Sequence, residues 1–428
     1  MSQERPKFKL HEVHLPPVSL RPRPRRCREV LRGQYLDFLV SDRRSAAGNA
    51  VGTSSVSKAA LAKPGAGRKS PLLAPDIDDH LPALAFRGAN DPSILEELAH
   101  PVKLLVRMDL APGDHVMLTA AVRDLDLSYP GLFKIHMAGP YPELWANNPH
   151  LTSLSLEDPD LNVLHAHYGE TYARANFLPY HFIHACRLDM EQRLGLPITQ
   201  GANRGDLHLT VAEREAPPPG ADLINGAPFW IINAGGKTDF TNKWWEFTRY
   251  QKLVELFPDI IWVQIGRNDQ HHPRLQGKNI VNLIGHTDLR ALMRLMWHAA
   301  GVITPVSLPM HLAAAIPAHP RYNRAERPCI VIAGGREAPT WEAYPWHMFL
   351  HTCGKLPCCA HGGCGASRVI RIPDGTKDDS KDKTCRRPVA TPSQQVIPRC
   401  MDMITVEDVA RHVHEYLMAY DYHKNPQA

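Results

Sequence analysis

From about residue 96 onward, short apolar runs alternate with longer amphipathic segments, and this alternation strongly limits what the chain can fold into. Residues 103–110 (KLLVRMDL) and 133–139 (FKIHMAG) have the apolar runs of buried strands, whereas residues 115–130 between them have helical apolar spacing. A strand, a helix and a second strand form a βαβ unit. The pattern therefore predicts an α/β fold with parallel sheets.

A second series of the same kind follows a Pro/Gly-rich break at residues 213–228. Its predicted strands are 229–235, 259–266, 279–285, 301–305 and 328–335, and its predicted helices include 243–257, 288–300 and 310–316. We therefore predict two Rossmann-like, doubly wound domains, residues 96–222 and 223–428. Ligands are expected in the cleft at the carboxyl ends of their strands.

Residues 1–95 differ in composition from the rest of the chain, because they are rich in Pro, Gly, Ser and basic side chains. Such a segment buries too little apolar surface to offset its ordering entropy, so we predict a flexible, disordered tail. A short ordered piece at 31–40 and a basic surface-binding role are the alternatives. The net charge of +5 lies largely in this segment and gives little support for a nucleic-acid partner.

The chain contains no apolar run of roughly 18 residues, and its first residues lack the apolar core of a signal peptide. We therefore expect no membrane span and a cytoplasmic location. In a reducing cytoplasm, clustered cysteines hold a metal more often than they form disulfides.

The first polar strand-to-helix turn contains Pro112, Gly113 and Asp114. In a βαβ unit this turn points into the cleft, and glycine allows a close backbone approach there. Asp114 is either the N-cap of the following helix or a general base held near an acceptor hydroxyl. Position alone leaves both interpretations open.

The second turn, residues 233–250 (NAGGKTDFTNKWWEFTRY), follows a strand and precedes a helix expected to begin at Trp244. Backbone N–H groups, hydroxyls and ammonium groups at a helix N-terminus favour an anion, so this loop is predicted to bind the donor's diphosphate. A solvated lysine loop is the alternative. The predicted donor-binding residues in it are Gly235, Gly236, Lys237, Thr238 and Lys243.

The third turn, residues 304–316, carries Ser307 and His311, where a helix N-terminus and a hydroxyl can meet phosphate. His311 is alternatively a packing residue. A fourth loop at 334–345 (GGREAPTWEAYP) follows the last predicted strand and is expected to close over the donor's base or sugar.

Five of the nine cysteines lie between residues 358 and 400, in a stretch with little apolar content. Four residues separate Cys359 from Cys364, twenty separate Cys364 from Cys385, and fourteen separate Cys385 from Cys400. Four thiolates can close a tetrahedral site for one structural zinc or iron ion, so a metal knot is predicted at 353–402. Cys358 is the alternative first ligand, and free structural cysteines are the alternative to a metal site.

These motifs resemble the ADP-heptose:lipopolysaccharide heptosyltransferases, the family 9 glycosyltransferases. The family's proposed catalytic aspartate follows a glycine as Asp114 follows Gly113, and its lysine-aromatic pair resembles Lys243-Trp244. Its donor loop usually reads Asp-Thr-Gly, where this chain has Val306-Ser307-Leu308. The cysteines resemble a bacterial and phage branch akin to the iron-binding autotransporter heptosyltransferases.

The resemblance implies a GT-B fold, in which two doubly wound domains face a cleft, and an inverting transfer of a sugar, heptose from ADP-heptose, to an acceptor hydroxyl. Asp114 would be the base, and no catalytic metal is expected because no DxD-like loop is evident. The expected partners are a nucleotide-sugar donor, a glycan or protein acceptor and further copies in a homo-oligomer. Another nucleotide sugar with a protein or modified-nucleic-acid acceptor, or a non-catalytic nucleotide-sugar-binding protein, are the alternatives.

Overall fold

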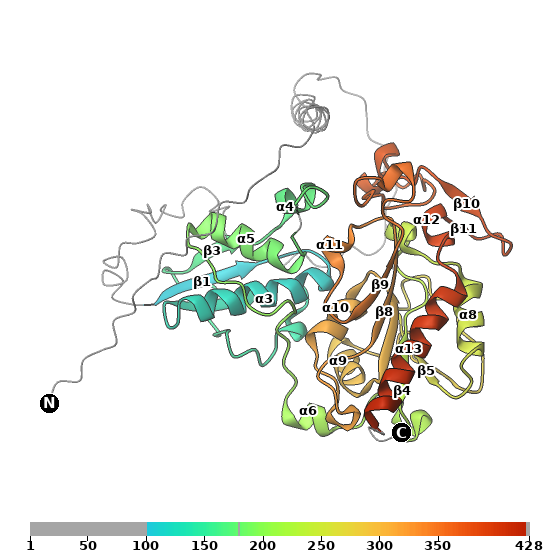
Figure 1. Ribbon diagram of the computed structural model, residues 1–428. Coiled ribbons are helices and arrows are strands. Elements are labelled where there is room, and N and C mark those ends of the chain that lie inside the picture. The colour runs from blue at the N-terminus through green and yellow to red at the C-terminus, as the bar shows by residue number, and fades with distance from the viewer. Residues whose placement is uncertain (1–100, 179, 425–428) are drawn as a thin grey trace, which may run out of the picture. The chain divides into compact units, whose positions relative to one another are not determined.

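The computed structural model describes residues 101–178 and 180–424 (Figure 1). The predicted tail at 1–95, with its short apolar piece at 31–40, lies outside the described residues. Within the described part, no helix is long and apolar enough to cross a membrane.

The N-terminal half contains a three-stranded parallel sheet in the order β2-β1-β3. Its elements are β1 (Val102–Arg107), α3 (Pro112–Ser128), β2 (Phe133–Ala138), the 3-10 turn η1 (Pro142–Leu144), β3 (Asn162–His165), α4 (Gly169–Ala173) and α5 (Ile183–Leu194). The predicted βαβ unit is present as β1-α3-β2, and α3 packs on α5. The short strand β3 was not predicted, because only four residues separate polar, turn-rich segments there.

The C-terminal half contains six parallel strands in the order β6-β5-β4-β7-β8-β9. The strands are β4 (Phe229–Ile232), β5 (Ile261–Gln264), β6 (Ile280–Asn282), β7 (Gly301–Pro305), β8 (Cys329–Gly334) and β9 (His347–His351). Numbered along this half, the order is 3-2-1-4-5-6, which is that of the dinucleotide-binding Rossmann fold. The predicted α/β architecture with two parallel sheets is therefore present, as in a GT-B-like fold.

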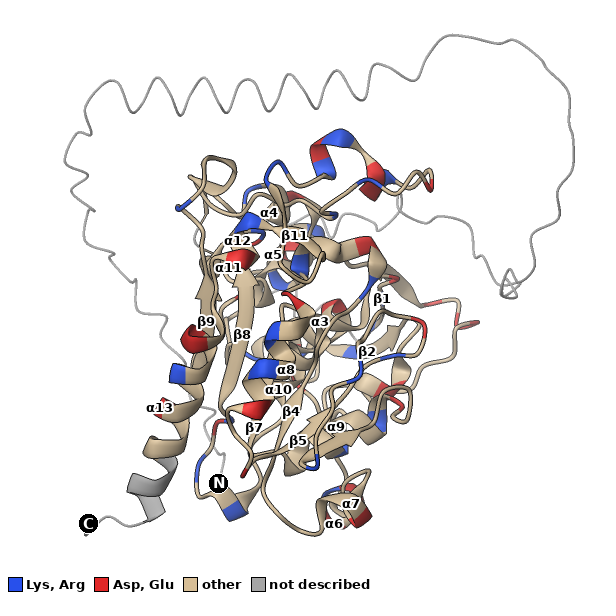
Figure 2. Cartoon of the chain, turned by 90° about the vertical axis from the view of Figure 1, so that its right-hand side faces the viewer, with Lys and Arg blue, Asp and Glu red and all other residues tan. Residues whose placement is uncertain are grey.

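Helices cover the larger sheet (Figure 1). They are α8 (Phe247–Glu255), α9 (Leu289–His298), α10 (Leu308–Ala315), α11 (Pro339–Glu342) and α13 (Val406–Lys424). Strand β9 and helix α13 were not predicted. Charged residues occur along α13 (Figure 2), while its apolar side packs on α8 and β8.

Between the two sheets the chain runs through α6 (Val211–Glu215) and α7 (Ala221–Ile224). Helix α6 starts with a capping box at Thr210 and Glu213, and Glu213 pairs with Arg290 of α9. The predicted domain boundary at residues 222 and 223 falls in α7, and its exact position stays a prediction. The buried apolar side chains of the N-terminal half and of part of the larger sheet form one continuous cluster.

The cysteine-bearing segment, residues 353–402, has little regular structure. It contains η4 (Pro357–Cys359), η5 (Lys377–Asp379), η6 (Lys381–Lys383), β10 (Pro388–Ala390), β11 (Val396–Pro398) and α12 (Arg399–Asp402). The side chain of Arg368 is only 1% exposed and pairs with Asp239, Asp374 and Asp379. One buried guanidinium thus organises a stretch that has almost no apolar core of its own.

Candidate active site

A cleft of about 1190 Å³ is lined by residues of both halves, where the strands of each sheet end. It brings together most of the residues predicted to form the site. Those that line it are Gly113, Asp114, Gly235, Gly236, Lys237, Lys243, Ser307 and His311. Thr238 is exposed and is not among the residues that line the cleft.

Asp114 is the third residue of α3, and Ala111 occupies the N-cap position of that helix. The alternative interpretation of Asp114 as the N-cap is therefore wrong. The phenol of Tyr168 donates a hydrogen bond to its Oδ1. Burial raises the pKa of Asp114, while Tyr168 and the positive charge of Lys243 act in the opposite direction. The result is a carboxylate more basic than an ordinary aspartate.

Gly113 is required by the contact between α3 and α10. A Cβ at this position would lie 2.9 Å from Cδ2 of His311. The His311 ring is buried, and its Nδ1 lies 2.8 Å from the hydroxyl of Tyr344. Burial lowers the pKa of His311 to about 3, so the ring is neutral and packs between the two halves. Its role in donor binding stays a prediction.

The Gly235-Gly236 turn pairs with the loop that follows β5. Both glycines have positive φ, +103° and +150°, and a Cβ on Gly235 would lie 2.0 Å from the carbonyl oxygen of His271. The amide of Gly236 donates to that same oxygen at 2.9 Å. Glycine is therefore needed here for backbone pairing, and the Gly236 amide is not free to meet an anion, contrary to the expectation for this loop.

The helix expected to begin at Trp244 begins instead at Phe247, and Thr238–Lys243 forms a 3-10 turn. The physical reason is that this segment is bonded to the cysteine-bearing segment. The amide of Asn242 donates to the Ser367 carbonyl at 3.1 Å, and the Thr241 hydroxyl accepts from the Val369 amide at 2.9 Å. The predicted helix N-terminus is therefore absent from this loop.

Lys243 ends that turn, and its ammonium group contacts the loops that follow β7 and β8. Nζ donates to the Val306 carbonyl at 3.2 Å and lies 3.0 Å from Oε1 of Glu337. Burial and the nearby Arg336 guanidinium lower the pKa of Lys243. Lys237, by contrast, is exposed at the rim.

Ser307 occupies the N-cap position of α10, but its hydroxyl does not cap the helix. Its Oγ accepts from Nδ2 of Asn233 at 3.2 Å and lies 3.0 Å from the Thr304 hydroxyl. Asn233 follows β4 and Ser307 follows β7, which are neighbours at the point where the strand order reverses. In doubly wound sheets this crevice binds the ligand.

Several residues of the cleft were not singled out from the sequence. They are Tyr168, Asn233, Arg336, Glu337, Trp341 and Glu342. The last four lie in the predicted fourth loop, 334–345, which therefore lines the cleft, while its contact with the donor's base or sugar stays a prediction. Asn233 was detectable as a polar residue directly after a buried strand. Tyr168 was not, because its contact with Asp114 joins positions 54 residues apart.

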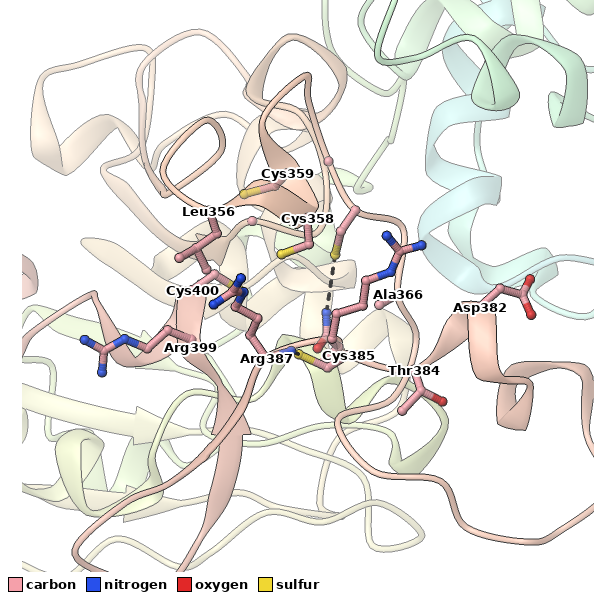
Figure 3. Close-up of a pocket in the computed structure, with 15 residues that line it drawn as sticks. Leu356, Cys358, Cys359, Ala366, Asp382, Thr384, Cys385, Arg387, Arg399 and Cys400 are labelled. Carbon is pink, nitrogen blue, oxygen red and sulfur yellow. Dashed lines mark hydrogen bonds between the residues drawn. The ribbon is translucent and has the colours of Figure 1, made fainter. Parts of the chain in front are cut away.

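The five clustered cysteines line a second, small cavity of about 120 Å³ (Figure 3). The Sγ of Cys359 lies 3.5 Å from the Thr352 carbonyl oxygen, to which the thiol donates, and it also interacts with the thiol of Cys358. Burial and the other sulfurs raise the pKa of Cys400 to about 12. In the part of the chain that the structure describes, no three such side chains are arranged to hold one ion, so the metal knot is not confirmed.

Three further described cysteines lie outside this cavity as free thiols. Cys186 and Cys329 are buried in the core. Cys353 is partly buried and donates from its Sγ to the Glu337 carbonyl at 3.2 Å.

Comparison with known proteins gives one family match, and no curated protein matches the chain. Residues 181–319 match the model of glycosyltransferase family 9 (heptosyltransferase). This stretch includes Lys243, Ser307 and His311 but ends before the cysteines and begins after Asp114.

Three solved structures are similar to the chain at low sequence identity. A family 9 glycosyl transferase from Veillonella parvula has a TM-score of 0.49 and 14% identity, covering 74% of this chain and 97% of its own. The E. coli ADP-heptose LPS heptosyltransferase II has a TM-score of 0.41 and 15% identity, with 74% and 99% covered. The iron-containing dodecameric glycosyltransferase TibC from enterotoxigenic E. coli has a TM-score of 0.47 and 17% identity, with 75% and 77% covered. The resemblance to glycosyltransferase family 9 (heptosyltransferase) is confirmed by the family match, over residues 181–319.

Proposed function

We propose that the protein is a glycosyltransferase that moves a sugar from a nucleotide-sugar donor to an acceptor hydroxyl, with heptose of ADP-heptose as the donor sugar. The observation that carries this proposal is that Asp114 and Lys243 line one cleft, at the carboxyl ends of two parallel sheets. The family match over residues 181–319 supports it. A protein that only bound nucleotide sugars would have no need of a partly buried carboxylate in the same cleft as the lysine that meets the diphosphate.

In this proposal Asp114 is the general base. It accepts the proton of the acceptor hydroxyl while the hydroxyl oxygen forms a bond to the anomeric carbon. The bond between that carbon and the diphosphate breaks on the opposite face, which inverts the anomeric configuration. Tyr168 positions the carboxylate by its hydrogen bond to Oδ1. The raised pKa of Asp114 strengthens it as a base.

Lys243 stabilises the leaving diphosphate in this proposal, with Lys237 at the rim. In the structure Nζ of Lys243 is held by Glu337 and by the Val306 carbonyl, so the diphosphate takes the place of one of these partners. Ser307 adds a hydroxyl at the start of α10. Because these groups supply positive charge and hydrogen bonds, we expect transfer without a divalent cation.

The cysteine pocket holds one structural iron or zinc ion in this proposal. Five thiols line a single cavity in a segment that is otherwise held by few apolar contacts, which fits a soft, thiolate-bound metal. The proposed ligands are Cys359, Cys364, Cys385 and Cys400, with Cys358, whose thiol interacts with that of Cys359, as the alternative first ligand. Bound there, the ion would cross-link residues 353–402.

We also propose that the protein is cytoplasmic, forms homo-oligomers and acts on a glycan or a protein.

The test of the main proposal is to offer ADP-heptose, other ADP-sugars and UDP-sugars to the purified protein. A bound donor stabilises the folded protein by RT ln(1 + [L]/Kd) and so raises its melting temperature. The expected result is a shift with ADP-heptose and release of ADP when an acceptor is present. No shift and no release with any nucleotide sugar would contradict the proposal.

A further inference from the structure

Glu342, the last residue of α11, is a buried carboxylate in the wall of the cleft. The residue is only 5% exposed. Its Oε2 is enclosed, and none of the described residues donates a hydrogen bond to it. Buried polar atoms in folded proteins almost always have a hydrogen-bond partner, so this oxygen calls for a donor that the protein itself does not supply.

The position of Glu342 is fixed by its neighbour in the sequence. Trp341 is 1% exposed and packs against Phe182 with a ring-centroid distance of 5.2 Å. The amide of Phe182 donates to the Trp341 carbonyl at 2.6 Å. Because these contacts tie α11 to the N-terminal half, the Glu342 carboxylate is held in place beside the cleft.

Three charged side chains that line the cleft act on the Glu342 carboxyl group. Burial raises the pKa of Glu342, Lys243 and Arg336 act in the opposite direction, and Asp114 adds to the rise. In the proposed reaction the sugar lies between the diphosphate at Lys243 and the acceptor hydroxyl at Asp114, since its anomeric carbon is bonded to the first and attacked by the second. Because Glu342 lines the same cleft as Lys243 and Asp114, it can lie beside a sugar bound between them.

We propose that Glu342 recognises the donor's sugar by accepting hydrogen bonds from its hydroxyl groups. This inference rests on the proposed function and identifies a residue that binds the sugar part of the donor. A nucleotide sugar brings hydroxyl groups to this part of the cleft, and these can donate hydrogen bonds. An ionised carboxyl group accepts such bonds more strongly than a neutral group does. The enclosed Oε2 gains its missing partner when the sugar is bound.

Glu337 in the same loop provides a matched control. It is equally buried, and its Oε2 also has no hydrogen-bond partner among the described residues, but its Oε1 is held by Lys243 at 3.0 Å and by Arg336. Its removal should change the environment of Lys243 and so alter the affinity for the diphosphate. Removal of Glu342 should alter only the part of the affinity that depends on the sugar.

The experiment measures Kd of ADP and of ADP-heptose by calorimetry for the full-length protein, Glu342→Gln and Glu337→Gln. For Glu342→Gln we expect ADP affinity within about twofold of the parent and ADP-heptose affinity lower by roughly 10- to 100-fold, as for loss of a charged hydrogen bond. For Glu337→Gln we expect both ligands to change together. Glu342→Asp, which keeps the charge but shortens its reach, should behave like Glu342→Gln and serves if that variant does not fold.

Two results would overturn the inference, and they differ. If the parent binds ADP-heptose and neither Glu342 variant weakens it relative to ADP, only the role of Glu342 is wrong. If the parent binds neither ADP nor ADP-heptose, the proposed function is wrong and the role of Glu342 with it.

Discussion

The cleft and the cysteine pocket share a wall at Asp382, but they are built in different ways. The cleft lies where strands of two parallel sheets end, so its shape follows from the sheets and needs no ligand. The cysteine pocket lies in residues 353–402, where regular elements are only three or four residues long. We infer that changes in the cleft should alter chemistry and leave folding intact, whereas changes in the cysteine pocket should alter local order first.

The largest expected effect is on metal content. We expect the purified protein to carry about one iron or zinc per chain, and Cys364→Ser, Cys385→Ser or Cys400→Ser to carry none, because a serine hydroxyl stays protonated near neutral pH. Binding at structural sites is worth about 10–16 kcal/mol, so residues 353–402 should become protease-sensitive. Elemental analysis and limited proteolysis provide the measurements.

Cys353→Ser is the control for these variants, because the Cys353 thiol bonds to the Glu337 carbonyl and a hydroxyl can do the same. It should keep the metal. Cys358→Ser compared with Cys359→Ser identifies the first ligand. A metal-free parent with full activity and reactive thiols would show that the pocket is not a metal site.

The next largest effect concerns Asp114. In Asp114→Asn the amide keeps the size of the side chain but cannot take a proton, so kcat/KM should fall by about 10²–10⁴. The Kd of ADP-heptose should stay close to that of the parent. Asp109→Asn, at an exposed aspartate five residues away, is the matched control. Transfer by Asp114→Asn within a few-fold of the parent would remove Asp114 from the role of base.

Lys243→Ala should weaken ADP by roughly 1.5–3 kcal/mol while leaving adenosine unchanged, because the lysine meets only the phosphates. Lys237→Ala, at the exposed rim, should have a smaller effect. Titration calorimetry with ADP and adenosine separates the two contributions. Equal losses for both ligands would mean that Lys243 shapes the cleft rather than binding diphosphate.

The same contrast between the two regions explains how much the sequence could predict. Asp114, Lys243 and Ser307 were found because polar residues that follow parallel strands meet at one edge of a sheet. Tyr168 was missed because its contact with Asp114 depends on how distant segments pack, whereas Glu342 lies in the loop 334–345 that was predicted to cover the donor's base or sugar but was not itself named. No spacing rule connects Glu342 with Asp114, which lies 228 positions earlier (342 − 114 = 228).

Local backbone geometry was harder to predict than the location of the site. The sequence predicts that the backbone amides of Gly235 and Gly236 bind an anion, but the Gly236 amide donates its hydrogen bond to the His271 carbonyl instead. The helix start was placed at Trp244, but hydrogen bonds to residues 367 and 369 hold that segment in a 3-10 turn. These bonds come from the cysteine-bearing segment, whose path cannot be read from apolar periodicity, since it has almost none.

The smallest expected effect is on stability, and it follows from the raised pKa of Asp114. A raised pKa means that the folded protein holds the proton more tightly than the unfolded chain, so ionised Asp114 destabilises the fold. This destabilisation is absent below the pKa of Asp114 in the unfolded chain, about 3.9, and reaches its full size above the pKa of Asp114 in the folded protein. Asp114→Asn should therefore increase the free energy of unfolding of the ligand-free protein at pH 8 by about 0.5–2 kcal/mol, and so raise its melting temperature.

The gain should shrink as the pH falls through the pKa of Asp114, because the parent then carries a neutral carboxyl group as well. Melting curves of the parent, Asp114→Asn and Asp109→Asn at pH 8 and pH 5 test this, with Asp109→Asn expected to match the parent at both. A less stable Asp114→Asn at pH 8 would mean that the hydrogen bond from Tyr168 outweighs the cost of burying the charge. The Asp114 carboxylate would then stabilise the fold. The inference that changes in the cleft leave folding intact, unlike changes in the cysteine pocket, would be wrong.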